Sequence, residues 1–126
     1  MKVQCPISIG ELIDKLTILK IKSERITDQN KLELVAQEIN ELESTLDNLK
    51  LKDLESLYEE LKKTNETLWE IEDKIRDKER AKKFDDEFIS LARAVYITND
   101  QRFEIKNKIN YRFGSLIKEV KSYQEY

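Results

Sequence analysis

Two runs of apolar residues with helical spacing occupy the middle of the chain and constrain its fold most strongly. Apolar side chains recur at steps of three and four, first over Leu32–Leu49 and then over Leu54–Ile75. This spacing places them on one helix face and is typical of a coiled-coil seam. If the spacing of the first run is continued past Leu49, it falls on the polar residues Asp53 and Ser56. The two apolar seams therefore cannot lie on one face of a single straight helix. We expect an antiparallel helical hairpin that turns near residues 50–53, with Asp53 as the N-cap of its second helix. The alternative is one long helix in which the position of the apolar face shifts.

The composition agrees with a helical fold and excludes several classes of protein. Two glycines, one proline and 39% charged residues suit long helices and disfavour a β-sandwich or barrel. We expect an all-α helical bundle in a single domain, residues 1–126, with an extended arm at 1–7 and a short C-terminal tail at 115–126. Basic and acidic residues, 23 and 26 in number, are interspersed, so no nucleic-acid-binding surface is expected.

The first helix carries a clear start signal. Ser8 and Glu11 have the spacing of a capping box, and the following run to about Arg25 is apolar on more than one side. A helix with only a narrow polar face is typical of a central position in a bundle. No signal peptide and no apolar stretch long enough for a membrane span is present, so we expect a cytoplasmic protein.

The last helix has similar signals at its two ends. Asp85 is placed as its N-cap, and Phe84 and Ile89 are placed as a hydrophobic staple around that cap. Gly114 suits the position just after the helix ends. The tail beyond it has four apolar residues that we expect to dock on the bundle: Leu116, Ile117, Val120 and Tyr123.

Charge interrupts the apolar seam of this last helix. The seam begins with Phe88 and ends with Ile109 and Phe113, but Asn99, Arg102 and Lys106 occupy its centre. Buried cations need carboxylates or a bound anion to compensate for lost hydration. We expect Arg102 and Lys106 to face Glu72, Arg76 and Glu79 of the preceding helix, with Tyr96 and Asn99 at the rim.

Three interpretations of this cluster remain open: a solvated helix face, a buried structural ion network, or a site for a small anionic ligand. Arg102 is the leading candidate, because a guanidinium matches carboxylate or phosphate oxygens bidentately. Trp69 is either a packing anchor or a stacking surface. The candidate ligand-binding residues are Arg102, Lys106, Asn99, Glu72, Arg76, Glu79, Tyr96 and Trp69.

Several kinds of chemistry are disfavoured. The chain has no histidine, which removes His-dependent triads and most zinc sites. Cys5 is the single cysteine, so no intramolecular disulfide can form. The chain does not match the acidic motif of all-helical nucleotide pyrophosphatases, because Lys63 occupies the position of the third glutamate of that motif. We expect no metal and no cofactor.

Three segments carry a resemblance to a known family. They are ISIGELIDKLTILKIKSERI at 7–26, LWEIEDKIRDKERA at 68–81, and LARAVYITNDQR at 91–102 with its continuation to Asn110. The chain resembles a family of small bacterial and phage proteins that is catalogued as a domain of unknown function, number 6165. The resemblance spans nearly the whole chain. It implies an α-helical cytoplasmic protein and supplies no activity and no catalytic residues.

Two functions follow as hypotheses. The first is a non-enzymatic helical module, expected to be a homodimer, that binds a protein partner or a small anionic ligand. The second is a small metal-independent all-α enzyme that uses Arg, Lys and Glu electrostatically on a carboxylate or phosphate substrate. The analogy is with helical chorismate mutases and concerns the site chemistry alone. We expect binding to neither nucleic acid nor membranes.

Overall fold

The chain folds into four α-helices and no strands, which confirms the all-α prediction. The computed structural model describes residues 1–126. Its helices are α1 (Ile9–Arg25), α2 (Gln29–Leu49), α3 (Glu55–Arg80) and α4 (Asp86–Arg112). None of them combines the length and the apolar character that crossing a bilayer requires.

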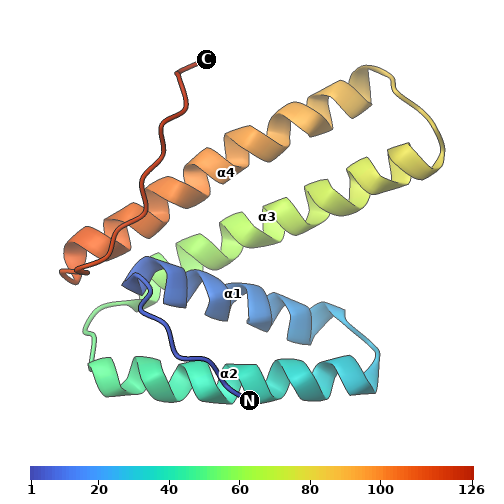
Figure 1. Ribbon diagram of the computed structural model, residues 1–126. Coiled ribbons are helices and arrows are strands. Elements are labelled where there is room, and N and C mark those ends of the chain that lie inside the picture. The colour runs from blue at the N-terminus through green and yellow to red at the C-terminus, as the bar shows by residue number, and fades with distance from the viewer.

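Helix α1 is the central element, as its two-sided apolar pattern predicts. It contacts each of the other three helices and lies between α2 and the α3–α4 pair (Figure 1). One core cluster joins it to α3 and α4, and a smaller one joins it to α2. The first cluster contains Ile13, Leu57, Leu61, Ile105 and Ile109. The second contains Leu19, Val35 and Ile39.

The predicted hairpin of α2 and α3 is correct in its turn and wrong in its packing. Lys50 and Asp53 both adopt positive φ, and the chain does turn between the two helices. However, the backbones of α2 and α3 do not pack side by side, because α1 lies between the two helices. The seam of α2 packs on α1 through Val35 and Ile39, whereas α3 packs on α1 and α4.

The helix caps follow the sequence signals in most cases. The Ser8 hydroxyl accepts a hydrogen bond from the Glu11 backbone N–H at 3.0 Å, and the Asp85 carboxylate accepts one from Phe88 N–H at 3.0 Å. The prediction that Asp53 caps α3 is wrong: Leu54 occupies the cap position and makes no side-chain cap hydrogen bond. Phe84 packs edge-on against Phe88, with ring centroids 5.1 Å apart.

The distal halves of α3 and α4 form a two-helix arm, residues 66–97, that extends beyond α1 (Figure 1). No residue of this arm is fully buried. Leu68, Ile71 and Ile75 of α3, and Leu91 and Val95 of α4, are half-buried. Two helices alone cannot enclose a core, since each has only one neighbour to cover its apolar face.

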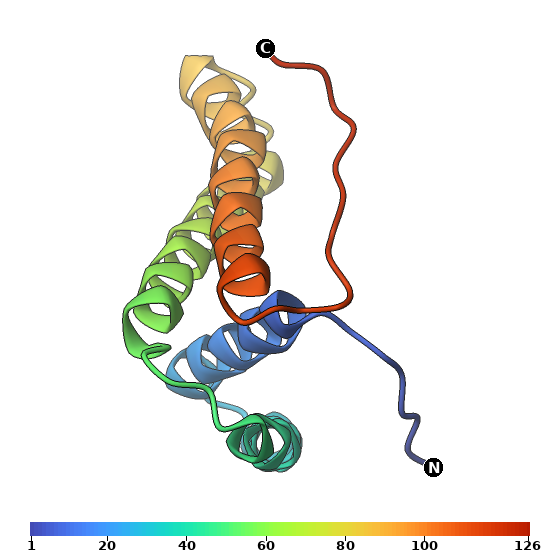
Figure 2. The same ribbon diagram turned by 90° about the vertical axis from the view of Figure 1, so that its left-hand side faces the viewer.

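The C-terminal tail turns back along α4 (Figure 2). Gly114 permits the reversal with a φ of 64°, and the Ser115 N–H donates to the Asn110 carbonyl at 2.8 Å. The expectation that apolar tail residues dock on the bundle is wrong, because Leu116, Val120 and Tyr123 are at least 84% exposed and Ile117 is 44% exposed.

Candidate functional site

A buried carboxylate is at the centre of the cluster that contains Arg102. The side chain of Asp14, on α1, is only 1% exposed. The Arg102 Nε donates to its Oδ1 at 2.9 Å, and Nη2 forms a second, short contact to Oδ2. This bidentate pair compensates for the lost hydration of both charges. The hydrogen bond to Asp14 raises the pKa of Arg102 above its already high ordinary value.

Polar groups of α3 complete the surroundings of this carboxylate. The Asn65 side-chain amide, itself buried, donates to Asp14 Oδ1 and to Thr17 Oγ1, both at 2.9 Å. Thr17 is fully buried and donates its hydroxyl proton to the Asp14 backbone carbonyl at 2.8 Å. One buried charge is therefore bonded by side chains from two other helices, α3 and α4.

Lys106 lies one turn after Arg102 and has three carboxylates around it. Its Nζ is 2.9 Å from Glu11 Oε2, 2.9 Å from Glu119 Oε2 and 4.0 Å from Asp14 Oδ2. Burial lowers the pKa of Lys106, but the hydrogen bonds to Glu119 and Glu11 outweigh this effect and leave the pKa raised. The ammonium group is therefore charged at neutral pH.

The partners predicted for these two cations are wrong. Glu72 and Arg76 pair with each other on the surface at 3.3 Å, and Glu79 is exposed on the arm. The carboxylates come instead from α1 and the tail, because α1 covers this part of α4. Of the eight predicted site residues, the structure brings together three: Asn99, Arg102 and Lys106. Asn99 accepts a weak hydrogen bond from Arg102 Nη1 at 3.4 Å.

The remaining candidates lie outside the cluster. Trp69 is half-buried on α3, in the arm, and Tyr96 is 43% exposed on α4. The prediction missed Asp14, Asn65, Glu11 and Glu119 as partners. A signal for Asp14 exists, since this acid lies among the apolar residues Leu12, Ile13 and Leu16 of the first helix. No comparable pattern marks Glu119, which belongs to a segment without helical periodicity.

A close approach of two backbones holds the cluster in register. The Gly10 N–H, in the first turn of α1, donates to Asn110 Oδ1 at 2.6 Å, and Ile9 N–H donates to Ser115 Oγ at 3.1 Å. A Cβ atom on Gly10 would lie 2.6 Å from the Lys106 carbonyl oxygen. The absence of a side chain there lets α1 approach α4 closely enough for Asp14 and Glu11 to reach the two cations.

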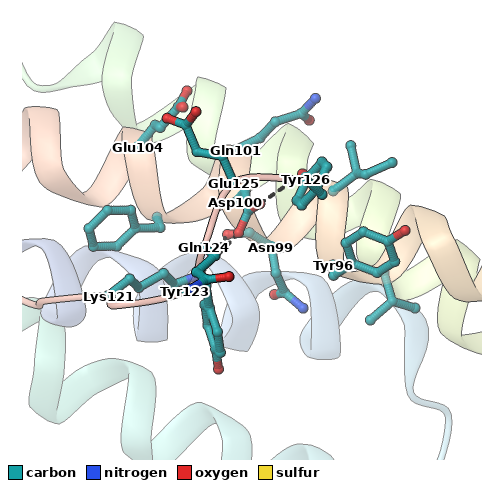
Figure 3. Close-up of a pocket in the computed structure, with 13 residues that line it drawn as sticks. Tyr96, Asn99, Asp100, Gln101, Glu104, Lys121, Tyr123, Gln124, Glu125 and Tyr126 are labelled. Atoms are coloured by element: carbon teal, nitrogen blue, oxygen red, sulfur yellow. Dashed lines mark hydrogen bonds and ion pairs between the residues drawn. The ribbon is translucent and has the colours of Figure 1, made fainter.

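A second feature lies on another face of α4, where the tail crosses it. Helix α4 and the tail enclose an open groove of about 990 Å³ (Figure 3). The Tyr126 hydroxyl donates to Asp100 Oδ2 at 2.8 Å, and Lys121 Nζ lies 3.6 Å from Asp100 Oδ1. The hydrogen bond to Asp100 raises the pKa of Tyr126.

The chain was compared with known families, with curated proteins and with solved structures. A family model described as a family of unknown function, DUF6165, matches residues 1–126. The chain belongs to the DUF6165 family. No curated protein and no solved structure matches it. The features of this DUF6165 protein that bear on its function are the polar cluster, the groove and the arm. No group of three or more acidic or cysteine side chains converges as a metal site would require.

Proposed function

We propose that this protein is a non-catalytic helical module that works as a dimer, with the α3–α4 arms of two copies packed against each other. One observation carries the proposal. Residues 66–97 contain no fully buried residue, although leucine, isoleucine and valine recur along both helices. A second arm would supply the two missing helices of a four-helix bundle, the common way to enclose such seams.

The surface area of the chain supports this proposal. The protein exposes 9230 Å², whereas a compact monomer of 15.0 kDa is expected to expose roughly 7,000 Å². The exposed segments at 1–7 and 116–126 contribute part of the excess. A standard interface covers only about 800 Å² on each partner. Burial of a fraction of the excess exposed surface, on the arm, would therefore be enough for a dimer.

The charges of the arm are compatible with the packing of a second, identical arm against it. Residues 66–97 carry seven basic and nine acidic side chains, with the two signs interspersed along α3. An arm of mixed charge does not repel an identical arm strongly, and antiparallel pairing lets opposite charges meet. A two-fold pair is also the commonest form of homo-oligomer.

The contacts of Arg102 and Lys106 support a non-catalytic role. Arg102 directs two nitrogen atoms to Asp14, and Lys106 contacts three carboxylates of its own chain. An electrostatic enzyme, like a binding site for an anion, needs cations whose charge is free for the ligand. At this cluster an anion would have to displace a carboxylate of the protein, so we assign the cluster a structural role.

The oligomeric mass tests the proposal. Sedimentation equilibrium at about 50 µM should give a mass near twice the 15.0 kDa of one chain. The variant Leu91→Lys places a charge on the apolar seam of α4 and should sediment as a monomer with its helical circular dichroism retained. Leu34→Lys, at a 67% exposed leucine on α2, is the matched control and should remain dimeric.

Two results would contradict the proposal. One is a wild-type mass near that of a single chain at this concentration, which decides the matter even if Leu91→Lys does not fold. The other is a helical Leu91→Lys variant that dimerises as tightly as the Leu34→Lys control.

A further inference from the structure

The groove between α4 and the tail combines aromatic rings with carboxylates. Tyr96 and Phe103 belong to α4, and Tyr123 and Tyr126 belong to the tail. The rings of Tyr96 and Tyr126 meet edge to face, with centroids 5.2 Å apart. Tyr96, Tyr123 and Tyr126 are 43% to 84% exposed, so a ligand can reach their faces. Figure 3 shows the three tyrosines together with Asp100 and Lys121.

A cation of the protein already occupies part of this groove. The Lys121 ammonium lies 5.2 Å from the centroid of the Phe103 ring and 5.9 Å from that of Tyr123. It also approaches Asp100 Oδ1 at 3.6 Å and donates to the Asn99 carbonyl at 3.4 Å. Aromatic faces within about 6 Å attract ammonium groups. The groove therefore has the aromatic faces and the carboxylate that attract an ammonium group.

The charge of the groove exceeds what Lys121 can neutralise. Three carboxylates line it, Asp100, Glu104 and Glu125, against the single ammonium of Lys121. Of these, Asp100 receives Lys121 and the Tyr126 hydroxyl, while neither Glu104 nor Glu125 has an ion-pair partner. A cationic ligand would therefore find both an aromatic surface and uncompensated negative charge.

Polar contacts and a few aromatic contacts hold the tail that carries Lys121. Its contacts to the bundle include the pairs Glu119–Lys106 and Lys121–Asp100 and the hydrogen bond from Tyr126, while Leu116 and Val120 are exposed. The Lys121–Asp100 pair is partly exposed and is long at 3.6 Å, and such pairs contribute little stability and are screened by salt. The Lys121 side chain can accordingly leave Asp100 at a small free-energy cost.

We propose that this groove binds a small organic polyamine, with one ammonium group taking the place of Lys121 between Asp100 and the aromatic rings, and another reaching Glu104 or Glu125. The site is built within one chain and does not rest on self-association. Apart from Asn99, which accepts a hydrogen bond from Arg102, the residues of the groove are separate from the Asp14–Arg102–Lys106 cluster.

Titration calorimetry with spermidine as the probe tests the site. In about 150 mM NaCl, the wild-type protein should bind one spermidine per chain. Asp100→Asn should weaken the dissociation constant at least about fivefold, because it removes the central carboxylate. Asp47→Asn removes the same charge from an exposed position on α2 that has no ion pair, and should bind like wild type.

A further variant tests the displacement of the resident cation. Lys121→Gln leaves a polar side chain but removes the competing ammonium, so spermidine should bind more tightly than to wild type. Weaker binding to Lys121→Gln would overturn the displacement. Absence of saturable binding, or equal weakening by Asp100→Asn and Asp47→Asn, would overturn the site, since the latter indicates general attraction to an acidic protein. The wild-type mass decides self-association separately.

Discussion

Asp14 shows how a single buried charge organises the centre of this protein. Its carboxylate is almost fully enclosed, and it is bonded by Arg102 of α4 and Asn65 of α3. A buried ion pair adds little net stability relative to a well-packed apolar pair, but the loss of one partner is costly. The pair therefore specifies which helices meet and in which register, because any slip between α1 and α4 would leave Asp14 without its partner.

Replacement of Arg102 by methionine should measure this dependence. Arg102→Met keeps much of the side-chain volume but leaves the buried Asp14 carboxylate with only the Asn65 amide and the Lys106 ammonium at 4.0 Å. We expect a loss of about 3 kcal/mol in the free energy of unfolding, measured by urea denaturation. The control Arg76→Met breaks an exposed pair with Glu72 and should cost less than about 0.5 kcal/mol. A silent Arg102→Met would mean that Asn65 and Lys106 compensate the Asp14 charge without Arg102.

The close approach of α1 and α4 at Gly10 leads to a second prediction about a single residue. In Gly10→Ala the new methyl group would approach the Lys106 carbonyl oxygen to 2.6 Å, so α1 and α4 must separate. Alanine favours a helix over glycine by about 1 kcal/mol, but overpacking typically costs 1–3 kcal/mol. We expect a lower thermal midpoint than wild type. A higher midpoint would mean that the two backbones can part without disturbing the contacts of Asp14.

At the level of single residues, the sequence identified the cations correctly and their partners incorrectly. Arg102 and Lys106 stand out because a helical period fixes which residues share a face. The period carries no information about which other helix covers that face. Both α3 and α1 contain acids at suitable positions, and only the crossing of α1 at Gly10 selects Asp14 and Glu11 over Glu72 and Glu79.

The same limit explains the errors at the scale of whole helices. The seams of α2 and α3 predict two helices with apolar partners, and the turn between them is found. Two apolar seams that follow each other in the sequence favour a hairpin of α2 and α3. However, α1 is apolar on two sides, so it packs between these two helices. Its central position follows from that two-sided pattern. The tail was misjudged, because its apolar residues have neither period nor neighbours.

Lys106 connects three elements, and its titration reports on them. Its raised pKa means that the folded state holds this proton more tightly than the unfolded state. The resulting stability is fully present below the unfolded pKa of about 10.4 and is lost as pH rises through the folded value. We expect NMR titration of ¹³C-labelled lysine side chains to place the Lys106 pKa above that of an exposed lysine.

The partners of Lys106 can be separated by variants in the tail. Glu119→Gln removes a hydrogen-bonding carboxylate, so the Lys106 pKa should fall and the tail should become more sensitive to proteolysis. Glu125→Gln removes an equal charge from the tail without touching Lys106 and should leave that pKa unchanged. If both variants gave the same Lys106 pKa, the contact with Glu119 would not persist in solution.

On the scale of the whole molecule, the fold has one enclosed end and one open end. The enclosed end contains both core clusters and the Asp14 network, and the open end is the arm of residues 66–97. Stability is therefore expected to be uneven, with faster amide exchange in a free arm than around α1. A second copy would cover the open end without altering the Asp14 network. Variants of the arm and variants of the network should therefore have separate effects on assembly and on internal stability.

Thermal unfolding over a range of concentrations provides a test of this division. If the folded protein is a dimer that unfolds to separate chains, a 100-fold rise in concentration stabilises it by about 2.7 kcal/mol per dimer. For about 250 residues unfolding together, this corresponds to a rise in Tm of roughly 5–10 °C. Leu91→Lys should lose that dependence on concentration, whereas Leu34→Lys should keep it. Arg102→Met, which strands a charge at the enclosed end, should lower Tm at every concentration and leave the slope unchanged. A wild-type Tm that is independent of concentration would mean that the arm folds without a second copy, and the half-buried seams of α3 and α4 would then be sufficient by themselves.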